Sequence, residues 1–175
     1  MRFTRLDIPD VWLVQPECRT DARGHFARTF CAAEFAAHGL PAAFAQCNLS
    51  FNRHRGTLRG LHWQDDPYQE GKLVRCTRGA IFDVAVDLRP GSPTRGRWVS
   101  ATLSAESADA LYIPPGFAHG FQAMAGDTEV FYQMTEPYRD GMARGLRWDD
   151  PALAIAWPLA DPILSERDAA LPLLT

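Results

Sequence analysis

The sequence predicts an all-β protein, an antiparallel sandwich or barrel, on three observations. Its apolar segments are short and strand-like, and turn-forming groups such as Arg78-Gly79 and Pro114-Pro115-Gly116 separate them. The 13 glycines and 13 prolines are spread along the chain, without a linker, a repeat or a low-complexity block. Few segments carry a helical pattern. Many short strands separated by turns are typical of sandwiches and barrels.

The expected strands are short apolar runs, several of which alternate with polar residues. In chain order they are Val11–Val14, His25–Phe30, Phe44–Ser50, Lys72–Thr77, Ala80–Leu88, Arg97–Leu103, Ala110–Ile113, Phe117–Met124 and Glu129–Thr135. The helical segments are an alanine-rich one that ends at Gly39, a short turn, and one close to the C-terminal end of the sequence. These are Cys31–His38, Ser104–Ser107 and Ser165–Leu171.

Length and composition limit the class of protein. A chain of 175 residues is about the length of one domain, so we expect residues 1–175 to form a single domain with its own core. The hydrophobic fraction of 46% and the charged fraction of 22% exclude a disordered chain, a collagen and a coiled coil. The net charge of −3 at pH 7 lacks the basic excess that binds phosphates, so we expect no nucleic-acid partner.

The sequence is most simply that of a cytoplasmic protein. Its N-terminal segment has no apolar stretch like that of a signal peptide. No apolar run approaches the ~20 residues that span a membrane, so no membrane partner is expected. The 4 cysteines show neither C-x-x-C spacing nor the density of a disulfide framework. Reduced thiols therefore fit better than disulfides or a zinc site.

Lysine is almost absent from this sequence. Lys72 is the single lysine among the 18 basic residues, and all the others are arginine. Arginine stays charged at any working pH, whereas a lysine ammonium is a compact point charge that responds to burial. A chemical task could require lysine where a surface position would not. Composition alone leaves this interpretation and chance survival equally open.

The expected strand Ala80–Leu88 has one apolar face, formed by every second residue from Phe82 onward. The opposite face carries Asp83 and Asp87 among small apolar neighbours. A solvated sheet face would explain the two carboxylates. So would a barrel interior, in which a buried carboxylate needs a partner and thereby helps to build a site. The pattern leaves both interpretations open.

A first polar stretch, residues 55–64, contains three side chains that could bind or react: Arg59, His62 and Gln64. Strand alternation places Arg59 and His62 on opposite faces. A second stretch holds His119, flanked by aromatic residues and glycines, and a third holds Tyr132. Taken singly, a histidine in an apolar strand is more often a satisfied core residue, and a strand tyrosine usually packs.

Two histidines in a small all-β protein are also typical of metal-binding cupins. Those sites commonly take two histidines from one strand as H-x-H, followed by a glutamate, and a third histidine from a distant strand. This sequence has no H-x-H pair, so we expect no metal and keep a metal-dependent oxygenase as the weaker alternative. It also lacks a Gly-rich phosphate loop, a G-x-S-x-G turn and a dinucleotide fingerprint.

A set of motifs that follow one another along the chain resembles the dTDP-4-dehydrorhamnose 3,5-epimerase family, from about residue 3 to residue 172. The motifs are Asp21–Phe26, Leu58–Gln64, Gly71–Cys76, Phe82–Arg89, Ile113–Phe121, Arg147–Pro151 and Leu164–Asp168. The resemblance implies a cupin-like jelly roll with a few short helices. It also implies a homodimer that exchanges an N-terminal strand, a nucleotide-linked 4-keto-6-deoxy sugar as substrate, and neither cofactor nor metal.

The resemblance assigns four catalytic residues. It implies that His62 is the base, that Asp168 orients and charges it, that Lys72 stabilises the enolate oxygen, and that Tyr132 is the acid. A C4 ketone acidifies the hydrogens on C3 and C5, so a base on one face and an acid on the other would invert these carbons. From the residues alone, Asp168 could equally complete a capping box with Ser165, and Tyr132 could be core.

The resemblance also implies residues that bind the substrate, chiefly through the diphosphate, the thymine and the sugar. They are Arg23, Phe26, Arg28, Gln46, Asn48, Arg59, His119, Tyr138 and Arg167, with Asp83 behind the site. Arg23 and Arg59 correspond to diphosphate-binding positions, and Tyr138 to an aromatic that stacks on thymine. His119 is expected to hydrogen-bond the substrate.

Four positions depart from the family pattern. Arg28 replaces a common glutamate, Cys47 and Ala143 replace acidic residues, and Gln133 replaces a lysine. Because a guanidinium only donates hydrogen bonds, it cannot replace an acceptor that faces thymine. We therefore hypothesise a related but different nucleotide sugar. An epimerase restricted to C3 or C5 remains open, as does a non-catalytic binder of sugar nucleotides, which would be expected to have lost His62, Lys72 or Tyr132.

Overall fold

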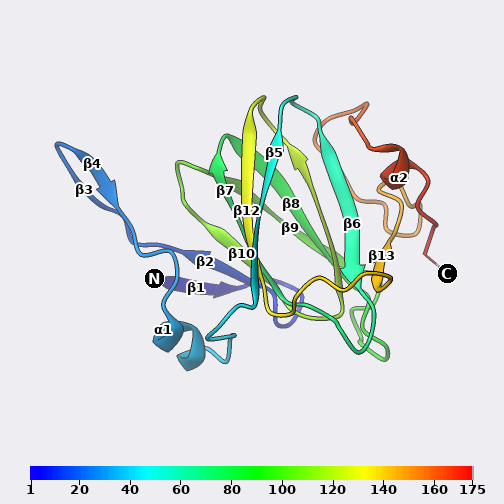
Figure 1. Ribbon diagram of the computed structural model, residues 1–175, viewed down its shortest axis with the longest axis horizontal. Coiled ribbons are helices and arrows are strands. Elements are labelled where there is room, and N and C mark those ends of the chain that lie inside the picture. The colour runs from blue at the N-terminus through cyan, green and yellow to red at the C-terminus, as the bar shows by residue number, and fades with distance from the viewer. Residues whose placement is uncertain (175) are drawn as a thin grey trace.

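The computed structural model describes residues 1–174, and most of its strands form two antiparallel sheets that face each other (Figure 1). The 6-stranded sheet has the order β1 (Arg2–Arg5), β2 (Trp12–Gln15), β10 (Ala110–Ile113), β7 (Lys72–Arg78), β12 (Thr128–Met134) and β5 (Gln46–Asn52). The 5-stranded sheet has the order β13 (Ala143–Gly145), β6 (Leu58–Gln64), β11 (Phe117–Ala123), β8 (Ala80–Asp87) and β9 (Trp98–Ser104).

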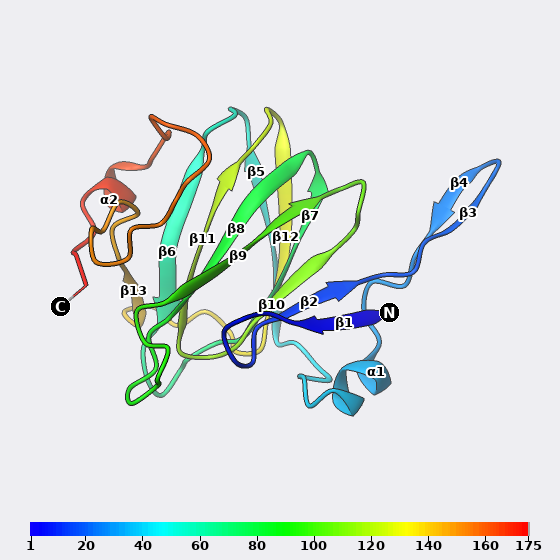
Figure 2. The ribbon, with the colours of Figure 1, turned by 180° about the vertical axis from the view of Figure 1, so that it is seen from behind.

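Three smaller elements lie outside these sheets. The strands β3 (Arg19–Asp21) and β4 (Gly24–Phe26) form a hairpin that projects away from the body of the molecule (Figures 1 and 2). Helix α1 (Ala32–Ala37) follows that hairpin, and the short helix α2 (Glu166–Ala169) lies beside β6 near the C-terminal end. In residues 1–174 no helix is both long and apolar enough to cross a membrane.

The main core lies between the two sheets. Ile81 and Ala85 of β8 pack there with Val74 of β7 and Val130 of β12, and all four side chains are fully buried. On the outer face of this sheet Val84 and Val86 are buried and Phe82 is half-buried, because the C-terminal segment covers it. The carboxylates of β8 therefore belong to the inter-sheet side, and of the two open interpretations the solvated sheet face is wrong.

The structure confirms the all-β, jelly-roll-like prediction, although the two sheets do not close into a continuous barrel. The strand β10 has the predicted bounds, and most other predicted strands are shifted by one or two residues. The predicted strand His25–Phe30 is shorter, because pairing within the hairpin ends at Phe26. Residues 104–107 form the end of β9 and a turn rather than helix, and α2 is shorter than predicted.

Some elements were absent from the prediction. These are β1, β3 and β13, which contain several charged residues and no apolar period. The sequence marks the segment of β6 as a polar stretch with strand alternation but does not predict its bounds. The cysteine expectation holds, because all four cysteines are free.

Asp87 ends β8 as a buried carboxylate that the structure satisfies with several donors. Its Oδ2 lies 2.8 Å from Nη2 of Arg89 and 2.6 Å from each of the hydroxyls of Ser92 and Thr94. Burial alone would raise the pKa of Asp87, but the hydrogen bonds from Arg89, Ser92 and Thr94 outweigh burial and hold the pKa far below its usual range. The stability that this carboxylate contributes is therefore present above pH ~4 and is lost as the pH falls below that value.

We expect Asp87→Asn to lower the free energy of unfolding at pH 7 by about 3 kcal/mol, because an amide cannot accept all the hydrogen bonds that the buried carboxylate accepts from Arg89, Ser92 and Thr94. The difference from wild type should shrink as the pH falls from ~4 toward 2, since protonation of the unfolded state then removes the wild-type advantage. Denaturant unfolding of both proteins at pH 7 and pH 3 measures this. An equal difference at both pH values would contradict the assignment.

Candidate active site

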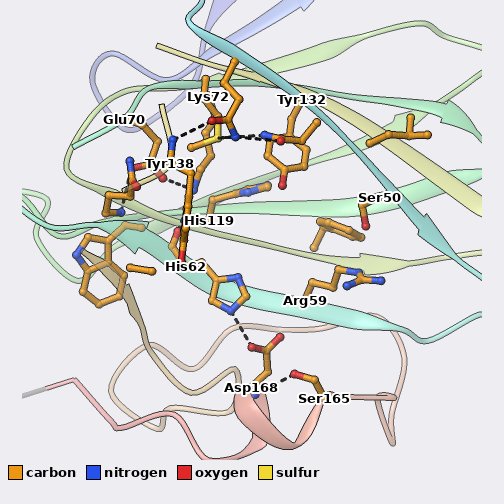
Figure 3. A pocket seen from close by; sticks show the side chains of 18 of the residues that line it. Ser50, Arg59, His62, Glu70, Lys72, His119, Tyr132, Tyr138, Ser165 and Asp168 are labelled. Carbon is orange, nitrogen blue, oxygen red and sulfur yellow. Dashed lines mark hydrogen bonds and ion pairs between the residues drawn. The ribbon is translucent and has the colours of Figure 1, made fainter. Parts of the chain in front are cut away.

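A pocket of about 760 Å³ opens between β5 and β6, where the two sheets are not hydrogen-bonded to each other in the described chain (Figure 3). Its size suits a small molecule. It is lined by Gln46, Asn48, Leu49, Ser50, Phe51, Arg59, His62, Trp63, Gln64, Glu70, Lys72, His119, Phe121, Tyr132, Met134, Tyr138, Ala143, Ser165, Arg167 and Asp168. The catalytic residues that the resemblance implied therefore lie together around one cavity.

A bulge in β6 brings Arg59 and His62 to the same side of the strand. The register between β6 and β11 shifts within this stretch, and both side chains line the pocket whereas Leu61 packs into the apolar core on the other face. Gly60 makes this possible: its φ is +113°, and a Cβ there would lie 2.6 Å from Cα of Gly120. The alternation that placed Arg59 and His62 on opposite faces is thus wrong.

His62 is held by Asp168, which reaches β6 from α2. Nε2 of His62 lies 2.7 Å from Oδ1 of Asp168, and Oδ2 accepts the backbone N–H of Gly60 at 3.3 Å. A carboxylate only accepts, so Nε2 carries a proton, and in the neutral imidazole Nδ1 keeps its lone pair. Burial tends to raise the pKa of Asp168, but the hydrogen bond and charge of His62 outweigh it and lower that pKa.

The contacts of Asp168 decide between its two interpretations. Ser165 does cap α2, since its Oγ accepts the N–H of Asp168 at 3.1 Å. The carboxylate of Asp168, however, does not return to the cap, and it bonds instead to His62 and Gly60. Residue 168 therefore has a backbone role in the cap and a side-chain role at the histidine. Leu58 fixes this segment to β6 by donating its N–H to the carbonyl of Ile163 at 2.9 Å.

Lys72 begins β7 and joins the two sheets through its ammonium group. Its Nζ donates to the backbone carbonyl of His62 at 3.0 Å and forms an ion pair with Glu70 at 2.8 Å. The side chain of Lys72 is only 8% exposed. The single lysine of the sequence is thus fixed in the pocket, beside the histidine.

Tyr132 lies on the wall of the pocket that belongs to the opposite sheet from His62. It pairs with Asn48 of β5 and Val74 of β7, and all of these strands belong to the 6-stranded sheet. Burial raises the pKa of the Tyr132 phenol; the charge of Arg59 lowers it and that of Glu70 raises it. The phenol is therefore protonated at neutral pH.

His119 stands directly across from His62 in the β11–β6 pairing, and a second carboxylate holds it. Its Nε2 lies 2.7 Å from Oδ1 of Asp83, whose side chain is fully buried. Oδ2 of Asp83 has no hydrogen-bond partner in the described part of the chain. The buried carboxylate of β8 thus supports a pocket histidine, as the interior interpretation of its strand required.

The sequence of this chain matches a known family. The model of that family, described as dTDP-4-dehydrorhamnose 3,5-epimerase, matches residues 5–175. This chain belongs to that family. It is therefore an epimerase, an enzyme of the isomerase class.

Individual relatives of this epimerase agree with the family match. The dTDP-4-dehydrorhamnose 3,5-epimerase of Sinorhizobium fredii is 48% identical over 99% of this chain and 90% of that protein. A dTDP-4-dehydrorhamnose 3-epimerase of Streptomyces niveus is 43% identical over 96% of this chain and 81% of its own length. The crystal structure of the Bacillus anthracis 3,5-epimerase with TDP and PPi bound has a TM-score of 0.96 and 39% identity, and 99% of each chain is covered.

The residues expected to bind the nucleotide fall into two groups. The epimerase places Gln46, Asn48, Arg59, Tyr138 and Arg167 on the pocket wall. Arg59 donates from Nε to Oδ1 of Asn52 at 2.8 Å, which directs its guanidinium along β5.

The other group, Arg23, Phe26 and Arg28, belongs to the projecting hairpin and the segment after it, and these residues do not line the pocket of their own chain. Phe26 is 70% exposed there.

Three of the four departures from the family pattern also lie away from the pocket. Cys47 and Gln133 are directly opposite each other on β5 and β12, on the face that points away from Tyr132 and Asn48. The acidic residue and the lysine that are common at these positions would therefore face each other across two strands, outside the site. Arg28 pairs with Glu34 at 3.4 Å. Only Ala143 lines the cavity of its own chain, and the departures at Cys47 and Gln133 therefore give no argument for a different nucleotide.

Sequence reasoning missed two polar residues of this epimerase pocket. Glu70 is 5% exposed and binds Lys72, yet its position before Gly71 looks like an ordinary loop. Ser50 lines the pocket with a buried hydroxyl that has no partner among residues 1–174. Alternation from Gln46 and Asn48 along β5 could have identified Ser50, whereas no sequence signal marks Glu70. The described residues contain no group of three or more His, Cys, Asp or Glu side chains that could hold a metal ion.

Proposed function

We propose that this enzyme epimerises a dTDP-linked 4-keto-6-deoxy sugar at C3 and C5 through an enolate. One observation carries the proposal: His62 with its carboxylate partner and the phenol of Tyr132 lie on facing walls of one pocket, with the ammonium of Lys72 beside them. A base and an acid on facing walls suit removal of a proton from one face of a sugar and its return to the other.

Each residue has one task in this reaction. Nδ1 of His62 takes a proton from the carbon beside the ketone, so a C–H bond breaks and an N–H bond forms. The electrons move onto the ketone oxygen, and Lys72 donates a hydrogen bond to the enolate that results. Tyr132 then gives its proton to the opposite face of the carbon, and solvent exchange restores both groups. Only protons move, so the balance requires no oxidant or reductant.

Arg59, Arg167 and Tyr138 support a nucleotide diphosphate as the handle of the substrate. Two guanidinium groups line the pocket rim and match the charge of a diphosphate. Tyr138 is 53% exposed and offers a ring on which a base can stack. We take the base to be thymine, since the relative from Bacillus anthracis holds TDP and the departures at Cys47 and Gln133 lie outside the pocket. Competition by dTDP, UDP, CDP and GDP tests this, and a preference for another nucleotide would refute it.

Proton exchange tests the reaction itself. The enzyme is incubated in deuterated water with dTDP-4-keto-6-deoxyglucose, and NMR follows deuterium at C3 and C5. We expect exchange at both carbons. Exchange at C3 alone would favour the second candidate, a 3-epimerase, for which the Streptomyces niveus relative is the precedent. No exchange, with dTDP still bound, would leave a non-catalytic binder.

We further propose that the projecting hairpin completes the site of a second copy in a homodimer. Arg23 and Phe26 are exposed and do not line their own pocket, and the β3–β4 hairpin projects from the body of the molecule in both views (Figures 1 and 2). A large aromatic that is 70% exposed on a projecting hairpin is an unsatisfied surface in a monomer. The first strand, β1, pairs with β2 of its own chain, so the exchanged element is the β3–β4 hairpin rather than β1.

Mixing two inactive variants tests the exchange. One variant is His62→Asn, and the other is the double substitution Arg23→Ala with Phe26→Ala. If the hairpin serves the partner, a mixed dimer contains one intact site, and random mixing restores about a quarter of the wild-type activity. If each hairpin served its own chain, no mixed dimer would have an intact site. Absence of recovery after subunits have been shown to exchange would therefore contradict the proposal.

We also propose that residues 1–175 form one epimerase domain and that the enzyme works in the cytoplasm. Both sheets contribute to one continuous core and to one pocket, which supports the first statement. Four free cysteines support a reducing compartment.

A further inference from the structure

Glu70 is a buried acid that the mechanism above does not use. It lies between β6 and β7 and is 5% exposed (Figure 3). Each of its carboxylate oxygens has its own partner: Oε1 lies 2.8 Å from Nζ of Lys72, and Oε2 accepts the backbone N–H of Gln64 at 2.9 Å. Because both oxygens of this buried carboxylate have protein partners, its position is fixed by contacts within the fold.

The backbone on either side of Glu70 is fixed as well. Gly71 donates its N–H to the hydroxyl of Thr135 at 2.8 Å, and its carbonyl accepts the N–H of Thr135 at 2.9 Å. A Cβ at Gly71 would lie 3.0 Å from the hydroxyl oxygen of Tyr112, so this position is also tightly packed. The segment that carries Glu70 and Lys72 is therefore anchored to Thr135, at the end of the strand β12 that carries Tyr132.

An ammonium group has three N–H donors, and the fold uses two of them at Lys72. One donates to Glu70 at 2.8 Å and one to the carbonyl of His62 at 3.0 Å. A tetrahedral group with two donors fixed has the direction of its third donor fixed as well. The third donor is left for a ligand in the pocket that Lys72 lines.

We propose that Glu70 is the positioning residue for Lys72, which it holds by one donor so that another meets the enolate oxygen. The inference rests on the proposed function, since it presumes that an enolate forms in this pocket. Glu70 touches neither substrate nor reacting atoms, and it acts through Lys72. It also keeps a negative charge beside the site, and this charge balances the ammonium until the enolate oxygen develops its own charge.

The charge of Glu70 has a second effect that a merely structural residue would not have. Tyr132 is half-buried: burial raises its pKa, the charge of Arg59 lowers it, and the carboxylate of Glu70 raises it. Lys72, His62 and His119 line the same pocket. Removing the negative charge makes the phenolate easier to form, so the pKa of Tyr132 falls. If activity needs the protonated phenol of Tyr132, a variant without the charge of Glu70 would then lose activity at a lower pH than the wild type does.

The main test is Glu70→Gln, which keeps the shape and an acceptor for Lys72 but removes the charge. We expect kcat to fall about 10- to 100-fold while KM stays within about twofold of wild type, because only the transition state gains charge at the ketone oxygen. The alkaline limb of the kcat profile should move to lower pH. Unchanged kcat and an unchanged alkaline limb would overturn the proposal.

A double-variant cycle shows whether Glu70 acts through Lys72. If it does, Lys72→Met and the combined Glu70→Gln/Lys72→Met variant should have the same residual exchange within about twofold, because the second change removes a support that no longer matters. Independent losses that multiply would overturn the proposal. Glu70→Asp keeps the charge but withdraws it by one methylene, and we expect it to lose kcat as well; wild-type kcat would count against a positional role.

Asp87→Asn is the matched control, since Asp87 is also a buried carboxylate paired with a cation but lies outside the pocket. It should lose stability and keep kcat. The exchange experiment on the wild type distinguishes failure of the proposed function from failure of the role proposed for Glu70. If the wild type does not exchange C3 or C5, the proposed function fails. If the wild type exchanges and Glu70→Gln behaves like it, only the role of Glu70 fails.

Discussion

Replacing His62 by asparagine is expected to abolish deuterium exchange at both C3 and C5 while the protein still folds and binds dTDP. An amide cannot accept a proton at neutral pH, and a general base is typically worth about 10²–10⁴ in rate. The loss should reach the upper end of this range, because one base serves both carbons. Its partner Asp168 lies 2.7 Å away and would remain buried without a histidine.

Three measurements together check this result. NMR follows exchange, calorimetry follows the binding of dTDP, and thermal unfolding follows the fold. His54→Asn is the matched control: His54 is exposed in the turn before β6 and lies outside the pocket, so its loss should leave exchange at the wild-type rate. Exchange at one carbon that survives in His62→Asn would mean that a second base serves that carbon, and His119 would be the first candidate.

The fold was predictable wherever a strand carries its own apolar pattern. The strands β8, β10, β11 and β12 have such patterns, since their burial follows from side chains that the sequence displays. The strand β1 was not predicted, because its sequence Arg-Phe-Thr-Arg has no apolar pattern. It forms a strand by pairing with β2. β13 likewise depends on pairing with β6. Such strands are defined by their partners, so local propensity does not identify them.

The site was predictable from motifs but not from periodicity. The resemblance supplied His62, Lys72, Tyr132 and Asp168, and the structure places all four around one pocket. Strict alternation separated Arg59 from His62, because a bulge depends on the neighbouring strand and cannot be seen in one segment.

The four departures from the family pattern also could not be interpreted from the sequence alone. An altered residue bears on specificity only if its side chain faces the pocket, and the cross-strand pair of Cys47 and Gln133 does not. That information belongs to the register between two strands that lie far apart in the sequence. Glu70 shows the opposite case, because a residue without any motif occupies a buried position next to the reacting groups.

Lys72→Arg is expected to cost the enzyme about 10²–10³ in exchange rate, although arginine occupies every other basic position of the chain. The pocket holds Nζ between Glu70 and the carbonyl of His62, in a space that suits a compact ammonium. A guanidinium is planar and broader, so it can keep the two protein contacts or reach the enolate oxygen, but it cannot do both from the same place. Lys72→Arg keeps the positive charge, but no N–H donor then points at the enolate oxygen while the two protein contacts are kept.

The converse substitution supplies the control for this prediction. Arg78→Lys, at the exposed end of β7, changes the same pair of residues in the other direction and should leave exchange unaltered. Thermal unfolding and dTDP binding of Lys72→Arg should stay close to those of the wild type, since the cation and its partner Glu70 remain. Near-normal exchange in Lys72→Arg would show that any cation suffices there. The single lysine would then be an accident of composition, and the enolate would have to be held by another group.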